Sequence, residues 1–263
     1  MIITHDALGY SELEMGEACL IHKSLLPREP LRAPTFEVTY KVNTYGDVGG
    51  DFLDYFYLAD RRLGIYLGDV VGKGLPAAMY SALAMGMLRS IHKTGAEPAA
   101  VLKLFNKRLR VRPLPHRYCS TQYAVFDPVT LELRVSNAGL PFPLHLHATG
   151  CRALGEGGLP SGLFDIAEYE QHAIRLTPGD AILFYTDGLS EACDPHGAEF
   201  GTQGLIDLCA RLDCRSPDHL LREVFAKIEN FAVGNQHDDM TAVALKVLAR
   251  AHPEHSKASS NGE

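Results

Sequence analysis

The segment Leu63–Met79, LGIYLGDVVGKGLPAAM, decides how the surrounding chain is expected to fold. Its first part, Leu63–Val70, is rich in large apolar side chains and predicts a β-strand. A glycine-rich turn follows, and Pro76 then stands where the first turn of a helix tolerates proline. The helix is expected over Ala77–His92, whose Ala, Met and Leu residues indicate that it is largely buried. The segment therefore predicts a strand, a tight turn and a buried helix, with Asp69 near the end of the strand.

On either side of this segment, strands come in runs and helices come in pairs. Two strands, Phe36–Val42 and Phe52–Ala59, precede it, and together with Leu63–Val70 they are expected to form an antiparallel meander. The elements expected after it are a helix over Pro98–Leu109, a hairpin over Gln122–Asn137, a strand over Ala181–Tyr185, helices over Gly204–Arg211 and Asp218–Phe231, and a strand over Thr241–Leu248. Because strands and helices do not alternate strictly, this order predicts an α+β fold with largely antiparallel sheets.

One folded domain is expected over residues 31–249, because no internal repeat and no Ser/Gly linker divides the chain. Ahead of it, residues 1–30 contain a predicted amphipathic helix over Ser11–Leu26, with leucine and isoleucine at roughly helical spacing. We interpret this part as a regulatory or linker helix. The polar residues 250–263 are expected to form a disordered tail.

The composition excludes several classes of function. The 263 residues carry 25 Lys and Arg against 32 Asp and Glu, a formal charge of −7, and no basic tract suited to a nucleic-acid backbone. No apolar run approaches the roughly 20 residues of a membrane span, and the first residues lack the basic-then-apolar order of a secretion signal. The six cysteines contain no C-x-x-C pair, so most are expected to be buried thiols. We expect a cytoplasmic protein that binds neither nucleic acid nor membrane.

Aspartates stand at the ends of several predicted strands. They lie in the turns Gly49-Gly50-Asp51, Gly68-Asp69-Val70, Thr186-Asp187-Gly188 and His237-Asp238-Asp239. Strand ends can bring side chains from distant positions to one rigid edge, so the pattern favours a carboxylate cluster. Clustered carboxylates repel each other unless a cation neutralises them, and an all-oxygen donor set suits Mn²⁺ or Mg²⁺ rather than zinc. Two such ions can activate a shared water for displacement at phosphorus, which predicts hydrolysis of a phosphate ester.

Each of these aspartates also has a simpler interpretation as a turn residue, because Asp-Gly and Gly-Asp are common turn dipeptides. That interpretation is kept for Asp47, Asp54, Asp180 and Asp194. The loop around Lys73 is not a nucleotide-binding P-loop, which needs four residues between its glycines and a Ser or Thr after the lysine. No serine or cysteine stands in a recognised nucleophile motif.

Five segments resemble the PPM-type metal-dependent serine/threonine protein phosphatases, and specifically their SpoIIE/RsbU-like bacterial branch. These segments are VGGDFLDYF (Val48–Phe56), GDVVGKGLPAAM (Gly68–Met79), STQYAVFDPVTLELRVSNAGLPFPL (Ser120–Leu144), LTPGDAILFYTDGLSEA (Leu176–Ala192) and HDDMTAVALKV (His237–Val247). They occur in the family's order and cover most of the chain. The resemblance implies a four-layer α-β-β-α sandwich, in which helices flank two packed antiparallel sheets and the metals lie at one end.

The resemblance also implies a role for each candidate ligand. Asp69 is expected to bridge two Mn²⁺ or Mg²⁺ ions, and it is the expected catalytic residue together with a metal-bridging hydroxide that attacks phosphorus. The Val70 carbonyl and Asp51 are expected at the second ion. Asp187 and Asp238 are expected at the first ion.

Three further positions matter for the resemblance. Asp239 matches a position that is Asp or Asn in the family, and it is expected just outside the ligand set. Val71 stands where many eukaryotic relatives have a histidine that is proposed as general acid, so the proton donor is unassigned and water is the default. Leu140 stands where the bacterial branch commonly has the histidine of Asn-Ala-Gly-His.

The implied substrate is a phosphorylated protein, namely the phosphorylated antagonist of an anti-sigma factor in a partner-switching pathway. The alternative is a catalytically silent sensor of the same fold that binds a phosphoprotein or a metal. The helix Ser11–Leu26 is expected either to dock an upstream regulator or a second copy of the chain, or to pack its apolar residues on its own domain.

Overall fold

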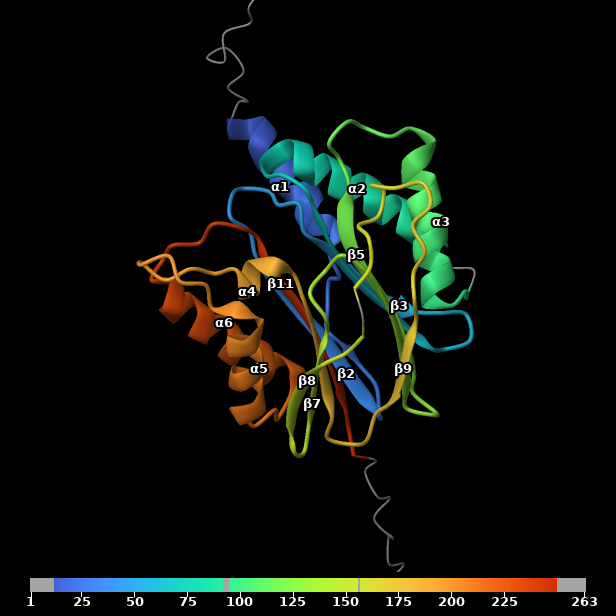
Figure 1. Ribbon diagram of the computed structural model, residues 1–263, viewed down its shortest axis with the longest axis vertical. Helices are drawn as coiled ribbons and strands as arrows, with labels where there is room; N and C mark the ends of the chain where they lie inside the picture. The colour runs from blue at the N-terminus through green and yellow to red at the C-terminus, as the bar shows by residue number, and fades with distance from the viewer. Residues whose placement is uncertain (1–11, 92–94, 156, 250–263) are drawn as a thin grey trace, which may run out of the picture.

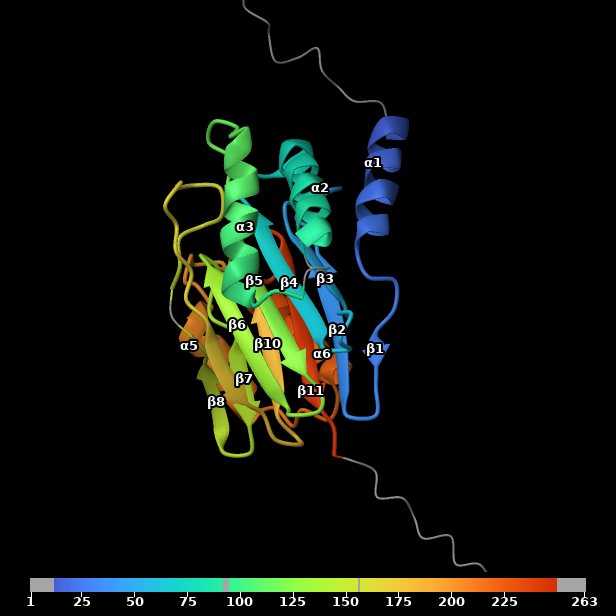
Figure 2. The same ribbon diagram turned by 90° about the vertical axis from the view of Figure 1, so that its right-hand side faces the viewer.

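Two antiparallel β-sheets pack face to face, and helices cover the outer face of each (Figure 1, Figure 2). The computed structural model describes residues 12–91, 95–155 and 157–249. The layers follow one another as helices, sheet, sheet and helices, which confirms the expected four-layer α+β sandwich. The predicted tail over residues 250–263 lies outside the described residues.

Each sheet combines strands from both halves of the chain. The first sheet has the order β1 (Leu31–Arg32), β2 (Phe36–Asn43), β11 (Met240–Val247), β10 (Ala181–Tyr185), β7 (Leu144–His147) and β8 (Gly150–Ala153). The second sheet has the order β3 (Phe52–Tyr57), β4 (Leu63–Val70), β5 (Cys119–Asp127), β6 (Glu132–Ala138) and β9 (His172–Arg175). All paired strands run antiparallel.

Two pairs of helices form the outer layers. The pair α2 (Gly74–Ile91) and α3 (Pro98–Val111) covers the second sheet, and the pair α5 (Gly201–Arg211) and α6 (Pro217–Ala232) covers the first. The short helix α4 (Asp187–Ser190) follows β10, and α1 (Glu12–Leu25) lies beside α2 (Figure 2). The predicted helices and the hairpin over Gln122–Asn137 are confirmed within a few residues at each end. His92, the expected last residue of α2, lies outside the described residues.

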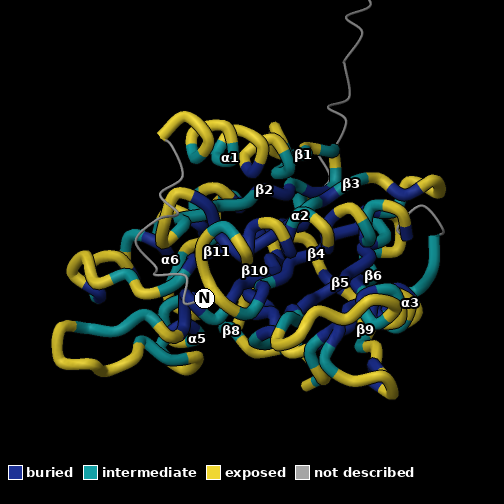
Figure 3. Tube along the Cα trace, turned by 90° about the horizontal axis from the view of Figure 1, so that it is seen from above, coloured by how far each residue is buried: buried dark blue, intermediate teal, exposed yellow. Residues whose placement is uncertain are grey.

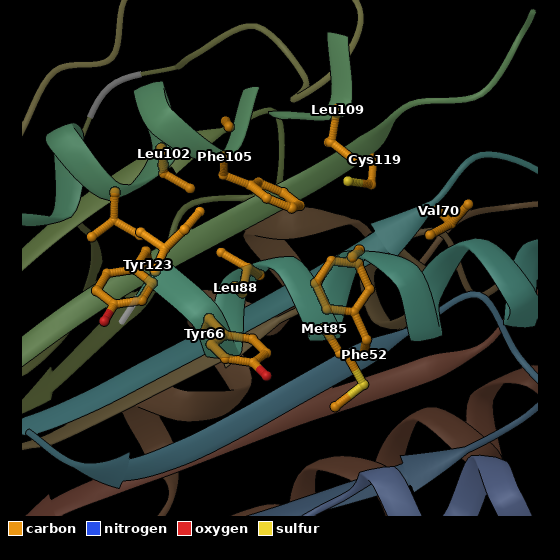
Figure 4. Packing of buried hydrophobic residues seen from close by; sticks show 14 of the residues in the cluster. Phe52, Tyr66, Val70, Met85, Leu88, Leu102, Phe105, Leu109, Cys119 and Tyr123 are labelled. Carbon is orange, nitrogen blue, oxygen red and sulfur yellow. The ribbon is translucent and has the colours of Figure 1, made fainter. Parts of the chain in front are cut away.

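Apolar side chains fill the three spaces between these layers. The space between the sheets is filled by a cluster that includes Phe36, Leu53, Ile65, Phe126 and Phe184. Figure 4 shows the space between the second sheet and its helices, where Leu88 and Phe105 meet Phe52, Tyr66 and Tyr123. Seen from above, the buried residues concentrate in the strands (Figure 3). Burial of this apolar surface is the main force that holds the layers together.

The expected meander of the first three long strands is wrong for β2. Its eight residues pair with β11 in the first sheet, from Phe36 opposite Val247 to Asn43 opposite Met240. The chain then crosses to the second sheet, where β3, β4, β5 and β6 form the antiparallel meander. Because β2 buries apolar side chains against the same inter-sheet core as β3, sequence pattern alone does not tell the two sheets apart. The short strands β1, β7, β8 and β9 were not predicted.

Helix α1 confirms the predicted helix, but three of its large apolar side chains are exposed. Leu13, Leu20 and Ile21 are exposed, and the one buried residue of the helix is His22. Leu25 packs against the cluster under α2. Of the two alternatives for this helix, packing on its own domain therefore holds for Leu25 but not for Leu13, Leu20 and Ile21. Figure 3 shows that α1 is exposed along much of its length.

The described helices have no membrane-spanning candidate, since each is too short or too polar to cross a bilayer.

Candidate functional site

Five aspartates gather at one end of the sandwich, where strands of both sheets begin or end. Asp51 directly precedes β3 and Asp69 lies near the end of β4, and these two strands pair with each other. Asp187 begins α4 directly after β10, while Asp238 and Asp239 directly precede β11, the neighbour of β10. Their charges act on one another across the two sheets. The structure thus brings together residues from four separate turns.

Asp51 and Asp69 form the buried part of this cluster. Asp51 is 3% exposed, and its carboxyl shares a hydrogen bond with that of Asp69. Burial is the main cause that raises the pKa of both groups; the charge of Asp69 adds to this for Asp51, and the charges of Asp187 and Asp238 add to it for Asp69. The Thr186 hydroxyl donates to Oδ2 of Asp51 at 2.9 Å, which opposes the rise. This part of the cluster therefore carries repulsion that a bound cation would relieve.

Asp239 holds the loop that leads into β3. The backbone N–H of Tyr45 donates to its Oδ1 at 2.8 Å, and that of Gly50 donates to its Oδ2 at 2.7 Å. A Cβ atom at Gly49 would lie 2.3 Å from Oδ2 of Asp239, so only glycine lets the backbone approach this carboxylate so closely. Asp239 therefore fixes the position of Asp51 through the intervening backbone.

Asp238 lies at the rim of the cluster and pairs with Lys73. The distance from Lys73 Nζ to Asp238 Oδ2 is 3.0 Å, and the same ammonium donates to the backbone carbonyl of His237 and lies 5.0 Å from the centre of the Tyr45 ring. Burial and then the charge of Asp238 raise the pKa of Asp187, and Lys73 opposes this rise. The sequence pattern places Lys73 only in a P-loop-like turn and does not predict its position in the site.

The oxygen donors of this cluster fit a hard divalent cation. A Cβ atom at Gly50 would lie 3.0 Å from the Val70 carbonyl oxygen and 3.5 Å from Oδ1 of Asp69, so the glycine leaves space next to two candidate ligand atoms. Among residues 12–91, 95–155 and 157–249, no three His, Cys, Asp or Glu side chains are arranged so that they could hold a metal ion as they stand. Carboxylate and carbonyl oxygens are nevertheless the donors that Mg²⁺ and Mn²⁺ prefer.

Two departures from the family pattern have structural explanations. Leu140 is buried in the cluster between the sheets, and its backbone N–H and carbonyl both bond to the Asn137 side chain, at 3.0 and 2.7 Å. It therefore fills the core and offers no polar group to the site. Val71 donates its N–H to Tyr118 at 3.2 Å and accepts from Arg117 Nη1 at 2.6 Å through its carbonyl, so it acts through its backbone.

Cavities of opposite character flank the cluster. One of about 200 Å³ is lined by Asp238 and Glu191 and is therefore acidic. Another of about 480 Å³ lies beside Val71 and is lined by His116 and Arg117. A phosphorylated ligand carries negative charge, so the second cavity is the better match for it.

The chain is similar in sequence to a known family and to several known proteins. Residues 59–248 match the family model described as Stage II sporulation protein E (SpoIIE). This range includes Asp69, Asp187 and Asp238 and begins after Asp51. The phosphoserine phosphatase RsbU of Bacillus subtilis (strain 168) is 24% identical over 202 residues, which cover 76% of this chain and 59% of RsbU. The chain spans about half the length of the curated relatives it matches.

Solved structures share the fold. The structure of the RsbU and RsbW domains of Rv1364c from Mycobacterium tuberculosis matches with a TM-score of 0.73 and 26% identity, over 86% of this chain and 63% of that chain. The SiaA-PP2C domain of Pseudomonas aeruginosa matches with a TM-score of 0.79 and 21% identity, over 89% of this chain and 95% of that chain.

Proposed function

The chain belongs to the SpoIIE family, and from this premise we propose that it is a metal-dependent protein phosphatase acting on phosphoserine or phosphothreonine. The observation that carries the proposal is the buried carboxyl pair of Asp51 and Asp69, with Asp187 and Asp238 beside it. A cluster of this kind is costly to fold unless it binds cations, and hydrolysis at phosphorus is the chemistry that such cations assist.

The ligand set we propose for two Mn²⁺ or Mg²⁺ ions consists of Asp51, Asp69, the Val70 carbonyl, Asp187 and Asp238. When bound, such ions make water more acidic and neutralise the phosphate oxygens.

Other residues of the chain support these ligands and the substrate. Thr186 orients Asp51 by a hydrogen bond, and Asp239 fixes the loop before it. Lys73 joins the turn after β4 to the turn before β11, so it holds Asp238 close to Asp69. No side chain is needed as nucleophile because water attacks phosphorus. Since Val71 has no acidic group, we assign the proton on the leaving oxygen to solvent.

We propose that the substrate is a phosphorylated anti-sigma factor antagonist in a partner-switching pathway. RsbU, a sequence relative, is named a phosphoserine phosphatase, and this supports a phosphoprotein substrate. The basic cavity at His116 and Arg117 supports it too, because it adjoins Val71 next to the candidate ligands. A catalytically silent sensor is not favoured, since every candidate ligand position retains its aspartate.

The test is phosphate release from a phosphoserine peptide by the full chain in Mn²⁺. We expect EDTA to abolish release and added Mn²⁺ to restore it. Asp69→Asn should abolish release, whereas Asp60→Asn should not, because the Asp60 carboxylate pairs with Arg62 in an exposed turn at 2.7 Å. Activity that survives in Asp69→Asn would overturn the proposal, and failure to act on any phosphoprotein of a native proteome would support the sensor instead.

We further propose that α1 pairs with α1 of a second copy of the chain. Its exposed Leu13, Leu20 and Ile21 provide the apolar surface. Its first turn is acidic and its last turn is basic, so two copies in antiparallel orientation place opposite charges together.

Light scattering on the full chain tests this pairing. We expect a dimer mass for the unchanged chain and a monomer mass for the double variant Leu20→Glu, Ile21→Glu. The control Leu104→Glu, on the partly exposed face of α3, should stay dimeric. A monomer for the unchanged chain would overturn self-association and favour docking of an upstream regulator.

A further inference from the structure

Three thiols gather where the hairpin of β7 and β8 meets α5, apart from the carboxylate cluster. Cys151 lies on β8, Cys209 lies in the last turns of α5, and Cys214 follows in the loop before α6. Helix α5 packs directly against β8, which is an edge strand of the first sheet (Figure 2). All three side chains belong to or pack against the apolar cluster beneath α5 and α6.

Two of these thiols interact across the contact between β8 and α5. The Cys151 and Cys209 side chains share a hydrogen bond, although they come from elements that are far apart in the sequence. Cys209 is 2% exposed, whereas Cys151 is only partly buried and can be reached from solvent. Cys214 is a neighbour of Cys209, but its own sulfur bonds to the backbone carbonyl of Ser216 at 3.9 Å. Cys151 is therefore the contact partner of Cys209.

The hydrogen bond makes the two thiols chemically unequal. It is the main cause that lowers the pKa of Cys151, and burial acts in the opposite direction there. The same hydrogen bond, followed by burial, raises the pKa of Cys209. The accessible sulfur is thus the one that an oxidant can reach, and the buried sulfur lies behind it. This division suits a reactive thiol with a resolving thiol behind it.

We propose that Cys151 and Cys209 form an oxidation site that peroxides convert into a reversible disulfide. The Cys151 thiolate attacks the peroxide O–O bond, which breaks to give a sulfenic acid on Cys151 and hydroxide. The Cys209 sulfur then attacks the Cys151 sulfur, and the hydroxyl group leaves as water with the proton from Cys209. Two thiols lose two electrons and hydrogen peroxide gains them, so the products are one disulfide and two waters. A thiol reductant reverses the reaction.

The disulfide ties an edge strand to the helix that covers it. Strand β8 pairs only with β7. Without the disulfide, it is held by that pairing and by its packing under α5. A covalent link restricts the unfolded chain and should raise the melting temperature of the oxidised protein.

The test is mass spectrometry of the full chain after treatment with hydrogen peroxide and alkylation of the remaining thiols. We expect the loss of two of the six free thiols, a mass decrease of about 2 Da before alkylation, and one linked peptide pair that contains Cys151 and Cys209. Dithiothreitol should restore all six thiols, and the melting temperature should rise on oxidation and return on reduction.

Single variants assign the roles of the two sulfurs. In Cys209→Ala the sulfenic acid on Cys151 should persist and react with dimedone, whereas in Cys151→Ser the thiol at Cys209 should stay reduced. Cys209→Ser serves if the alanine variant does not fold. The control Cys193→Ser changes a partly buried thiol elsewhere and should still form the disulfide.

Other outcomes would overturn the proposal. A linked peptide pair of Cys209 and Cys214 would show that the wrong partner was chosen. Oxidation of Cys151 to sulfinic acid without any link to Cys209 would show that the contact does not lead to a bond. Because the readouts are the state of the thiols and the melting temperature, none depends on phosphatase activity.

Discussion

Both ends of the sandwich bury aspartates in strand-end turns, yet their surroundings are opposite. Strand β10 runs from Asp180 at one end to Asp187 at the other. Asp180 is 5% exposed, but its Oδ2 accepts from the Thr177 N–H at 2.9 Å and lies 3.0 Å from Nε2 of His145. At the other end, the neighbours of Asp69 are further carboxylates.

This difference separates a structural aspartate from a ligand candidate. A buried carboxylate with local hydrogen-bond partners is satisfied by the fold itself. A carboxyl group surrounded by other carboxyl groups has a raised pKa and needs a partner from outside the chain. The surroundings of Asp69 and Asp180 therefore predict different consequences of mutation.

The largest expected effect is that of Asp69→Asn on turnover. The substitution removes a proposed ligand of both ions, so kcat in Mn²⁺ should fall by about 10³-fold or more. The free energy of unfolding in EDTA should not fall, because asparagine is close in size to the protonated carboxyl and adds no charge that the other carboxylates would repel. Phosphate release measures the change in kcat, and urea unfolding measures the change in the free energy of unfolding. A large loss of stability would mean that Asp69 resembles Asp180.

Asp180→Ala should show the reverse pattern. It leaves His145 Nε2 and the Thr177 N–H without their acceptor, so the free energy of unfolding should fall by about 2 kcal/mol, as for a lost buried hydrogen bond to a charged group. The kcat per folded molecule should stay within about twofold, because Asp180 lies at the end opposite the cluster. Urea unfolding and phosphate release at saturating Mn²⁺ measure both. A kcat loss comparable to that of Asp69→Asn would erase the distinction between the two ends.

Substitution of Asp239 should affect both stability and metal-dependent activity, since this residue supports the site by structural hydrogen bonds. Asp239→Ala removes the acceptor for Tyr45 and Gly50, and this should cost about 2 kcal/mol of the free energy of unfolding and raise the Mn²⁺ concentration for half-maximal activity. Asp239→Asn keeps one acceptor oxygen, so its free energy of unfolding and its Mn²⁺ requirement should lie between those of the alanine variant and the unchanged chain. Titration of activity with Mn²⁺ checks this prediction. An alanine variant that reaches half-maximal activity at the same Mn²⁺ concentration as the unchanged chain would contradict it.

The smallest expected effect is the contribution of His145, the partner of Asp180, to the pH dependence of the free energy of unfolding. Burial, opposed by Asp180 and assisted by His147 and Arg152, lowers the pKa of His145 below 6.5. The unfolded chain then binds this proton more readily, so His145 should lower stability as pH falls below about 6.5 until the folded group also titrates. Urea unfolding at several pH values should show a shallower acid-side loss for His145→Asn. An equal slope in both proteins would contradict the prediction.

Much of the site could be predicted because its residues are marked by local patterns. Each candidate aspartate stands at the end of a strand that is recognisable from its apolar residues; these are Asp51, Asp69, Asp187 and Asp238. Because the strands of a sandwich end at only two edges, side chains at strand ends can come close together. The interpretation of Asp180 as a turn residue likewise agrees with its hydrogen bond to Thr177.

The remaining features depend on long-range pairing, which local patterns do not contain. Strand β2 was assigned to the wrong sheet because its partner β11 lies at the far end of the described chain. Lys73 was missed because its ion pair with Asp238 forms only after both sheets are assembled, although its position between two glycines after β4 was a usable signal. The role of Leu140 follows from burial, which a single substituted position does not reveal.

The central position of β11 has a consequence for protein synthesis. This last described strand is inserted between β2 and β10, and Asp238 and Asp239 directly precede it. On the ribosome, β2 and β10 therefore emerge long before the strand that joins them, and their unpaired edges must be kept from other nascent chains. The carboxylate cluster is completed only when β11 is in place, so a partly translated chain lacks the complete cluster.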